Sequence, residues 1–567
     1  MLIGVIFLGT VLRFWHLDLK PLWLDEVLTA LFSLGRSYSE LPLEVVFSLS
    51  KLEEVFTLKP GISCSTITQT LAAQSTHPPL FFCLMYSWYN WLGTEPLIWV
   101  MRTLSVVMGV GGIIAIYCLS RIAFSPAAAL MTAALMTLSP FAVYLSQEAR
   151  HYTMPMLLIT LALWALIQIE QDIYVRHQHS KPIIWLLWGI VNSIGCYIHY
   201  FFIIAFLAQL ITLTGFMYWR RRLLPTGSWV TLSLTVIGVV VSYLPWFPVL
   251  LDDFGRAETG WLPKPEHIAP LYQTLLGWLA MVIALPIEAQ PLLIAIPMAL
   301  LTVAFGIWLG RCYWRGYTNL WQQSSTWLAT VTLSSFTINV LLQYAVIVYL
   351  LGKDLTIAPR YNFVYYPALC VLLGASLTLG YKQPSYGDLR NTISPSPPLP
   401  LSPGIFLPLS VSLLSSLLVA SNLVFLKPFH PQQVAQDMNL EPNIPVMVVM
   451  GYKNIQDVAL GLSFALALDQ LRPDLDDSTS KPLSSNQSPT GSYFAFLQRE
   501  HGYELVWQQL SRLSALPAPP LNLWVIAPGL KRRSYPQQLE LSTQTTCTLD
   551  PTQHYRIGIP YQLYRCL

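Results

Sequence analysis

Long runs of apolar, uncharged residues are the feature that most constrains this chain. Residues 230–251, 292–309 and 406–426 are nearly free of charge, and each is close to the roughly 20 residues that a helix needs to cross the hydrocarbon core of a bilayer. Of the 567 residues, 54% are apolar and only 11% are charged, whereas soluble domains carry about 25% charged residues. The sequence therefore excludes a soluble fold and predicts an all-α polytopic membrane protein.

Basic residues between the apolar runs set the predicted orientation. Because cytoplasmic connections are rich in Lys and Arg, we assign to the cytoplasm the connections that contain Arg121, Arg176 and Lys181, Arg220–Arg222, Arg311 and Arg315, and Lys382 and Arg390. About eleven crossings satisfy this alternation, near residues 1–17, 97–120, 126–145, 152–169, 183–199, 201–219, 229–251, 291–310, 327–351, 361–380 and 405–426. Two shorter or proline-broken pieces, 79–92 and 271–287, are predicted to be interfacial or re-entrant. Counting them as crossings gives the alternative of thirteen helices.

The polar segments define the predicted domains. Residues 1–426 form a transmembrane domain whose first extracytoplasmic loop, residues 18–96, is too acidic to lie in lipid. Within this loop, apolar residues from Leu41 to Phe56 recur at helical spacing and predict a helix lying in the membrane interface. A Pro/Ser-rich stretch, residues 383–403, predicts a flexible cytoplasmic linker.

The C-terminal residues 427–567 are polar and predict a small α/β domain. Its β-like runs cover residues 446–450 and 523–527, and an apolar helical run covers residues 455–471. An odd number of crossings places this domain outside the cytoplasm, on the side of the acidic loop. For Cys547 and Cys566 in an exported tail, two alternatives stay open, a disulfide and two free thiols, because spacing alone does not establish a disulfide.

Several functions are excluded by composition and by missing motifs. The formal net charge of +3 is small and scattered, so nucleic acid is not an expected partner. No Gly-rich phosphate loop follows either β-like run. The eight cysteines show no CxxC spacing, and no His or Cys cluster has the spacing of metal ligands. We therefore expect neither a metal nor a cofactor.

Two polar clusters precede the second apolar run. Asp25 and Glu26 follow the first predicted helix, where adjacent carboxylates favour contact with water, a cation or a substrate, and where one can act as a base. The alternative is a helix N-cap at Asp25 with Glu26 in the first turn. His77 stands before two prolines that aim it toward the loop surface, although an interfacial histidine with a satisfied ring explains it equally well.

Two further clusters lie on the same predicted face. The connection Ser146–Tyr152 contains Glu148 and Arg150, which indicate either an ion-paired site or a solvated loop. Arg102 lies in an otherwise apolar run and belongs with them. Arg360 and Tyr361 open a late helix, where an Arg beside a hydroxyl suits a lipid phosphate or snorkels to ordinary headgroups. Since all of these clusters map to the non-cytoplasmic face, we expect one site there.

The motifs in this order resemble a known family. Trp-Leu-Asp-Glu in a long acidic loop is followed by His-Pro-Pro-Leu, then by Ser-Gln-Glu-Ala-Arg, and then by Arg-Tyr at a late helix. This order is similar to that of the membrane glycosyltransferases of GT-C fold. It is most similar to the protein O-mannosyltransferase and lipid A aminoarabinose transferase group, glycosyltransferase family 39 in the broad sense. The resemblance covers about the first 430 residues and is strongest over residues 13–169.

The resemblance implies a reaction and a location. A polyprenyl-phosphate sugar would donate a hexosyl or pentosyl group, with inversion, to a hydroxyl of a lipid, glycan or protein. Transfer would take place at the outer face of a cytoplasmic membrane, in a cell envelope that we suppose to be bacterial. The lipid-linked sugar is then a substrate, and no cofactor is required.

The resemblance also implies roles for the candidate residues. Asp25 would be the base and Glu26 would support it. His77 would contact the donor phosphate or orient Asp25, and Arg360 with Tyr361 would hold the lipid phosphate. Glu148 would supply an anion near the positively charged sugar, and Arg102 and Arg150 would bind the donor.

A transporter or flippase of lipid-linked sugars is the main alternative. Such proteins carry ionisable residues near the bilayer midplane and inverted repeats, whereas the charges here lie at one face and the two halves show no repeat. An outer-face glycan ligase or polymerase is a second alternative, against which the early Asp25 loop and the His-Pro-Pro motif argue. A non-catalytic relative is the third.

Overall fold

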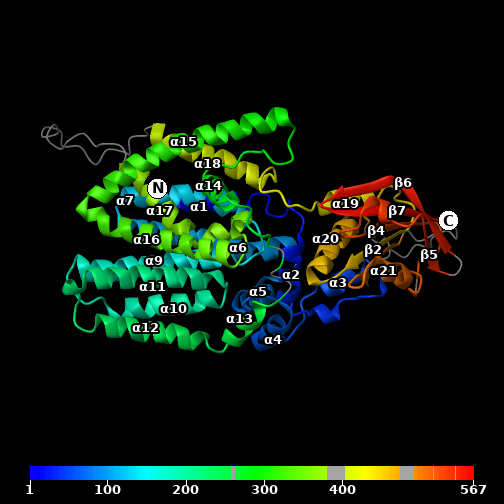
Figure 1. The fold of residues 1–567 in the computed structure, drawn as a ribbon, viewed down its shortest axis with the longest axis horizontal. Coiled ribbons are helices and arrows are strands. Elements are labelled where there is room, and N and C mark those ends of the chain that lie inside the picture. Colours follow the sequence, from blue (N-terminus) through cyan, green and yellow to red (C-terminus); the bar gives the residue numbers. More distant parts are fainter. Residues whose placement is uncertain (257–259, 261, 380–402, 473–490, 515, 543–544) are drawn as a thin grey trace. The chain divides into compact units, whose positions relative to one another are not determined.

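The computed structural model describes every residue except 257–259, 261, 380–402, 473–490, 515 and 543–544 (Figure 1). The chain divides into two compact units. The helical unit comprises residues 1–19, 75–84 and 99–426, and the sheet unit comprises residues 20–74, 85–98 and 427–567. The predicted linker, residues 383–403, lies outside the described residues except at its end, where a helix begins at Pro403.

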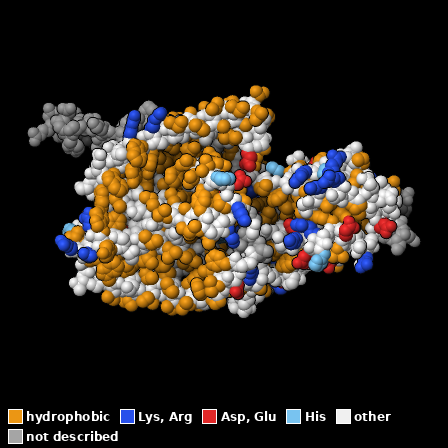
Figure 2. All heavy atoms as spheres, viewed as in Figure 1, with side chains coloured by type: hydrophobic (Ala, Val, Ile, Leu, Met, Phe, Trp, Pro, Cys, Tyr) orange, Lys and Arg blue, Asp and Glu red, His pale blue; other side chains and the backbone are white. Residues whose placement is uncertain are grey.

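The apolar helices of the helical unit occupy the predicted crossings. Among the described residues, six are long and apolar enough to span a membrane: α6 (Leu97–Ala123), α9 (Thr153–Tyr174), α11 (Phe201–Trp219), the span Ser228–Asp253 formed by α12 (Ser228–Tyr243) and α13 (Phe247–Asp253), α15 (Leu292–Gln322), and α16 (Ser324–Ala345) with its π-helical extension Val346–Leu350. Four are shorter: α1 (Leu2–Phe14), α10 (Pro182–Cys196), α17 (Tyr366–Leu379) and α18 (Pro403–Ala420). Hydrophobic side chains dominate the visible face of this unit (Figure 2). The predicted polytopic helical membrane fold is confirmed.

One crossing is broken in the middle. The helices α7 (Pro126–Leu138) and α8 (Pro140–Ser146) meet at an angle of 57°. The break follows from the sequence Ser139–Pro140, because Pro140 has no N–H to donate to the carbonyl of Met136 one turn earlier. A carbonyl left without a partner in a membrane interior costs several kcal/mol, so the break requires another donor.

Arg13 supplies that donor. Its side chain is 0% exposed, and its guanidinium donates to the carbonyl oxygens of Met136 at 2.9 Å and Thr137 at 3.2 Å. It also donates to Ser146 Oγ at 3.2 Å, at the far end of α8. A side chain at Gly109 of α6 would collide with this arrangement, because an added Cβ would stand 2.3 Å from Ser146 Oγ.

In the second of the two predicted interfacial or re-entrant pieces, residues 271–287, a short helix is followed by irregular chain. Helix α14 (Ala269–Ala280) has 12 residues, or about 18 Å of rise, which is too short to cross the hydrocarbon core. The irregular chain after it is buried, and serine hydroxyls pair its backbone groups. Ser139 donates to Met281 O at 2.6 Å, Ser412 donates to Val282 O at 2.9 Å, and Ser415 accepts from Ala284 N at 3.0 Å. Buried irregular backbone satisfied in this way is expected of a re-entrant segment.

The sheet unit contains a seven-stranded sheet of order β1-β3-β2-β4-β7-β6-β5. Its strands are β1 (Val46–Ser48), β2 (Val446–Tyr452), β3 (Ser492–Gln498), β4 (Leu521–Ile526), β5 (Gln538–Ser542), β6 (Thr545–Ile557) and β7 (Ile559–Cys566). Strand β2 lies between β3 and β4 and is parallel to both, and the other pairs are antiparallel. Both predicted β-like runs and the predicted helix, α20 (Ile455–Leu471), are therefore confirmed.

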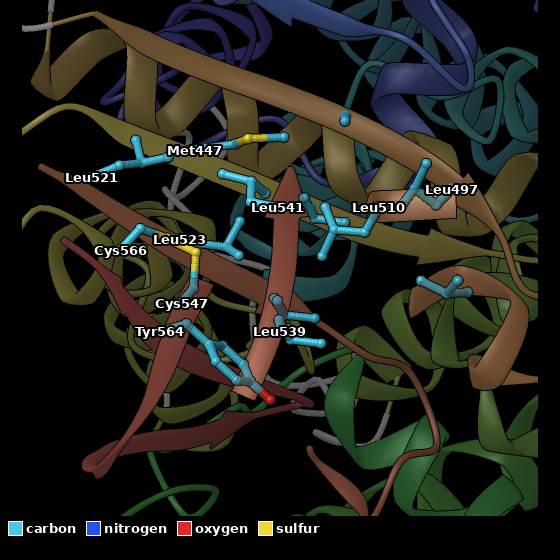
Figure 3. Close-up of a cluster of buried hydrophobic side chains, with 14 of the residues drawn as sticks. Met447, Leu497, Leu510, Leu521, Leu523, Leu539, Leu541, Cys547, Tyr564 and Cys566 are labelled. Carbon is cyan, nitrogen blue, oxygen red and sulfur yellow. A yellow bond between two sulfur atoms is a disulfide. The ribbon is translucent and has the colours of Figure 1, made fainter. Parts of the chain in front are cut away.

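Helices complete the sheet unit, and a disulfide links two of its neighbouring strands. The helices are α2 (Leu24–Ser33), α3 (Lys51–Val55), α4 (Cys64–Gln74), α19 (Pro431–Met438) and α21 (Tyr503–Leu510). The helix α5 (Leu80–Leu92) has 13 residues, and its sequence is divided between the helical unit, up to Leu84, and the sheet unit, from Met85. Cys547 of β6 and Cys566 of β7 form a disulfide within a buried apolar cluster that includes Leu523 and Tyr564 (Figure 3).

The predicted interfacial helix of the acidic loop is wrong. Residues 41–56 form the strand β1 and the short helix α3 instead. Strand β1 pairs antiparallel with β3, with Phe47 opposite Phe494, and Phe47 is buried. The helical spacing of apolar residues arose because Leu49, Leu52 and Phe56 all pack into the sheet unit. The buried residues of a strand and of the turn after it thus had the same sequence spacing as the residues on one face of a helix.

Replacing Arg13 by Leu is expected to destabilise the protein. The variant leaves two buried carbonyl oxygens unpaired, and each costs about 1–3 kcal/mol. Unfolding of the detergent-solubilised protein, followed by heat or denaturant, measures the loss. The control is Arg121→Leu, the same change at an exposed position of α6. Equal stability of the two variants would contradict the account of the broken crossing.

Candidate functional site

Four connections of the helical unit supply the polar residues of the candidate site. They are the segment before α5, which carries His77; the α8–α9 connection, which carries Glu148 and Arg150; the α10–α11 connection; and the 3₁₀ helix η6 (Pro359–Val364), which carries Arg360 and Tyr361. Prolines or short turns fix each of them, since Pro78 and Pro79 follow His77 and Pro359 opens η6.

The structure brings His77 and Arg150 into direct contact. A guanidinium nitrogen of Arg150, Nη2, lies 3.1 Å from His77 Nε2. Because a guanidinium only donates hydrogen bonds, His77 Nε2 is the acceptor and the ring proton lies on Nδ1. That Nδ1 lies 3.1 Å from Ser75 Oγ and donates to it. The contact therefore fixes His77 as a neutral imidazole in one tautomer.

Two further histidines complete the cluster, His151 of the predicted polar connection Ser146–Tyr152 and His199, which was not predicted. The ring of His151 lies 5.3 Å from the ring of His77 and 4.7 Å from that of His199. His199 Nδ1 accepts a hydrogen bond of 2.9 Å from the backbone N–H of Phe201. We call His77, Arg150, His151, His199 and Arg360 the histidine–arginine cluster.

Arg360 and Tyr361 border this cluster. Tyr361 lies 6.5 Å from the ring of His199 and 4.7 Å from that of Phe201. Its backbone carbonyl accepts a 2.7 Å hydrogen bond from the hydroxyl of Tyr344. The guanidinium of Arg360 lies over the ring of Tyr361 at 5.6 Å, within the range of a cation–π contact. Its charge also acts on His151 and His199.

The electrostatics of the cluster favour neutral histidines. Burial lowers the pKa of His151 well below its ordinary value, and the neighbouring His199 ring, the Arg150 guanidinium, the His77 ring and the Arg360 guanidinium lower it further. Burial lowers the pKa of His199 in the same way, with His77, Arg150 and Arg360 adding to the effect. Both rings are therefore uncharged at neutral pH, and the two guanidinium groups carry the positive charge of the cluster.

An ion pair outside the cluster holds the His77 segment. Arg256 donates to the backbone carbonyl of Ser75 at 3.0 Å and forms a 3.1 Å ion pair with Asp253 at the end of α13. Asp253 also accepts a hydrogen bond from the hydroxyl of Tyr200, next to His199. The same carboxylate thus links the segments that carry His77 and His199.

Arg102 and Glu148 are buried near the end of α1. Arg102 of α6 is 1% exposed and donates to the carbonyl of Leu17 at 2.7 Å. Glu148 is 3% exposed, and its carbonyl accepts from the N–H of Arg150 at 2.8 Å. Gln147, the residue before it, donates to the carbonyl of Trp15 at 2.8 Å. The α8–α9 connection is therefore tied to the end of the first helix.

Asp25 and Glu26 belong to the sheet unit, at the start of α2. The N-cap of this helix is Trp23, and both carboxylates lie in its first turn. The alternative of an N-cap at Asp25 is therefore wrong, although the positive end of the helix dipole still favours an ionised Asp25. Lys427 Nζ lies 3.9 Å from the ring of Trp23 and holds the residue at which the helix starts.

The sequence-based prediction did not include His199, because this residue fell inside a predicted crossing. The predicted crossing covered residues 183–199, but α10 ends at Cys196, which puts His199 in the connection. A histidine at the end of an apolar run was the signal that could have found it. Among the described residues, no group of three or more His, Cys, Asp or Glu side chains is arranged to hold a metal ion.

The fold of the chain is of the GT-C type. The structure is similar to crystal structures of ArnT from Cupriavidus metallidurans. The one bound to undecaprenyl phosphate has a TM-score of 0.54 and 11% identity, covering 99% of this chain and 97% of that one. The apo structure has a TM-score of 0.52 and 11% identity, covering 93% of this chain and 92% of that one.

A family comparison adds a sequence relationship. Residues 76–246 match the family described as dolichyl-phosphate-mannose-protein mannosyltransferase. This range contains His77, Arg150, His151 and His199. No curated protein matches the chain in sequence. The family match and the shared fold confirm the resemblance to the GT-C glycosyltransferases inferred from the motifs.

The tautomer of His77 is expected to depend on Arg150. With Arg150 present, the nitrogen-15 spectrum of histidine-labelled protein is expected to show His77 neutral, with its proton on Nδ1. In Arg150→Leu the acceptor Nε2 loses its donor, so His77 is expected to gain a proton more readily as the pH falls. The control is Arg315→Leu, at an exposed position of α15. An unchanged His77 signal in Arg150→Leu would contradict the assigned hydrogen bond.

Proposed function

We propose that this chain transfers a sugar from a polyprenyl-phosphate donor to a hydroxyl acceptor, with inversion at the anomeric carbon. The observation that carries the proposal is the histidine–arginine cluster, which gathers two guanidinium groups and three imidazoles at connections between apolar helices. Such a set of donors suits a phosphate held at a membrane surface. The ArnT structure with undecaprenyl phosphate, a protein of the same fold, supports a polyprenyl phosphate as the ligand.

The chemistry of the reaction requires charge stabilisation more than proton donation. As the bond between the anomeric carbon and the phosphate oxygen breaks, its electron pair stays on the phosphate. Arg150 and Arg360 are the proposed stabilisers of this charge, with His77, Tyr361 and Arg102 as further contacts of the donor. Since the activated bond is already present in the donor, the proposal needs no cofactor.

The acceptor hydroxyl must lose its proton as it attacks the anomeric carbon. We propose Asp25 as the base that takes this proton, with Glu26 in support, because their motif matches the acidic residues of the first loop in the resembled family. Both lie in the first turn of α2, where the helix dipole favours the ionised form of a carboxylate, the form that can accept a proton. Glu148 is the proposed anion for the positive charge that develops on the sugar ring.

The proposed location is the outer face of a cytoplasmic membrane. The arginine-rich connections of the helical unit, such as Arg220–Arg222, lie at the opposite ends of α9 and α11 from the histidine–arginine cluster. Together with the positive-inside rule, this arrangement supports a non-cytoplasmic location for the cluster. The acceptor class remains a lipid, glycan or protein hydroxyl in this proposal.

The test is transfer of label from a panel of radiolabelled polyprenyl-phosphate sugars to lipid, glycan and protein fractions. Asp25→Asn is expected to lower the rate by at least about 100-fold, the typical contribution of a general base, while undecaprenyl phosphate still binds. Asp18→Asn, the same change at an exposed position, is the control. A fully active Asp25→Asn protein would remove the proposed base.

Arg360→Leu separates donor binding from catalysis. Loss of a charge-assisted hydrogen bond to phosphate costs about 1.5–3 kcal/mol, so this variant is expected to bind undecaprenyl phosphate roughly 10- to 100-fold more weakly. Arg315→Leu is the matched control. If wild type transfers label from no donor but moves lipid-linked sugars across vesicle membranes, the chain is a flippase and the proposed function is wrong.

A further inference from the structure

The three histidines of the cluster differ in how their ring nitrogens are used. His77 accepts from Arg150 at Nε2 and donates to Ser75 at Nδ1. Since an arginine has no lone pair to offer, a proton on His77 Nε2 would break the bond to Arg150 and place two positive charges together. His77 therefore cannot take up a proton without losing its place in the cluster.

One ring nitrogen of His199 is also already used as a hydrogen-bond acceptor. Its Nδ1 accepts from the backbone N–H of Phe201 at 2.9 Å. A proton on Nδ1 would remove this acceptor and leave a buried N–H without a partner, at a cost of about 1–3 kcal/mol. His199 is thus held as a neutral ring with its proton on Nε2.

His151 is the exception among the three. Its side chain is 0% exposed, and neither ring nitrogen has a hydrogen-bond partner among the described residues. The rings of Phe81, Tyr152, His77 and His199 surround it at centroid distances of 4.7 to 5.7 Å. A buried polar atom without a partner is rare and calls for a physical reason. His151 is the one histidine of the cluster that can gain a proton without breaking a hydrogen bond of the protein.

The charged and protonatable groups that disfavour an added proton on His151 come from four elements. They belong to His77 before α5, Arg150 on its own connection, His199 after α10 and Arg360 on η6. The rings of Tyr152 and Phe81 also face His151. A bound anion would instead favour an added proton on His151, because its negative charge cancels the field of the two guanidinium groups.

The proposed reaction supplies an anion whose charge grows. The donor is a phosphodiester with a single negative charge, whereas the released polyprenyl phosphate is a monoester. The second ionisation of a phosphate monoester has a pKa of about 6, so the product carries close to two negative charges at neutral pH. Two guanidinium groups and one imidazolium can balance this charge better than two guanidinium groups alone.

We propose that His151 takes up a proton from solvent when a polyprenyl phosphate monoester binds at Arg150 and Arg360, and that it is a positioning residue for the leaving phosphate. The inference rests on the proposed function, since it assigns the phosphate to this cluster. Its consequence is that the affinity for the monoester depends on pH through His151. Binding raises the proton affinity of His151, and linkage requires that protonation of His151 strengthens binding.

Calorimetric titration of undecaprenyl phosphate into purified protein tests the proposal. Wild type, His151→Asn and the control His179→Asn, an exposed histidine in the α9–α10 connection, are compared in two buffers of different ionisation enthalpy. The difference in heat between the buffers counts the protons taken up on binding. Protonation of the ligand itself is common to all three proteins and cancels in the comparison.

Wild type and His179→Asn are expected to take up more protons than His151→Asn at neutral pH. Their advantage in affinity over His151→Asn is expected to grow as the pH falls from about 8 to about 6.5, by up to about tenfold for each unit by which binding raises the pKa of His151. Equal proton uptake by all three proteins would overturn the inference while leaving the proposed function intact. If wild type does not bind undecaprenyl phosphate, the proposed function fails as well.

A second measurement guards against a variant that does not fold. Histidine-labelled wild type is examined by nitrogen-15 NMR with and without undecaprenyl phosphate, and the His151 signal is assigned from His151→Gln. A shift of this signal to that of an imidazolium supports the proposal. A His151 signal that stays neutral at saturating ligand overturns it.

Discussion

The structure of the helical unit depends on one buried arginine at a broken helix. Pro140 removes a hydrogen bond from the crossing formed by α7 and α8, and Arg13 restores it by donating to the carbonyls of Met136 and Thr137. A buried guanidinium is stable only where its donors are used, so Arg13 needs these carbonyls as much as they need Arg13. The bond to Ser146 then ties α1 to the end of α8.

This constraint determines where the polar connection lies. Gln147 follows Ser146 and donates to the end of the first helix, and Glu148, Arg150 and His151 come next along the chain. The broken helix therefore delivers a run of buried polar residues to one end of the helices. Arg150 meets His77 there, and the two fix each other's hydrogen-bonding roles. A site made in this way is organised before any ligand binds, which reduces the cost of reorganisation in binding and catalysis.

Much of the helical fold follows from hydropathy, because each long apolar run has one stable outcome in lipid, a spanning helix. Two strands of the sheet unit, β2 and β4, were also predicted from the sequence. Local pattern failed where tertiary contacts override it. Residues 41–56 form a strand with β3, more than 440 residues away in the sequence, and no local signal announces such a partner.

The candidate site was predictable in part. His77, Arg150, Arg360 and Tyr361 stood out as polar residues next to apolar runs, and the structure brings them to one cluster. His199 was hidden, because a helix boundary displaced by three residues turned an apparent membrane residue into a connection residue. The state of His151 was also hidden, since it depends on which nitrogens of its neighbours are already bonded. Which ring nitrogens already form hydrogen bonds is visible only in the three-dimensional structure.

The most direct test of the account is an experimental structure of the protein with undecaprenyl phosphate bound. The account predicts that the phosphate lies within hydrogen-bonding distance of the guanidinium groups of Arg150 and Arg360. A phosphate bound elsewhere in the protein, with both guanidinium groups in their present contacts, would contradict it.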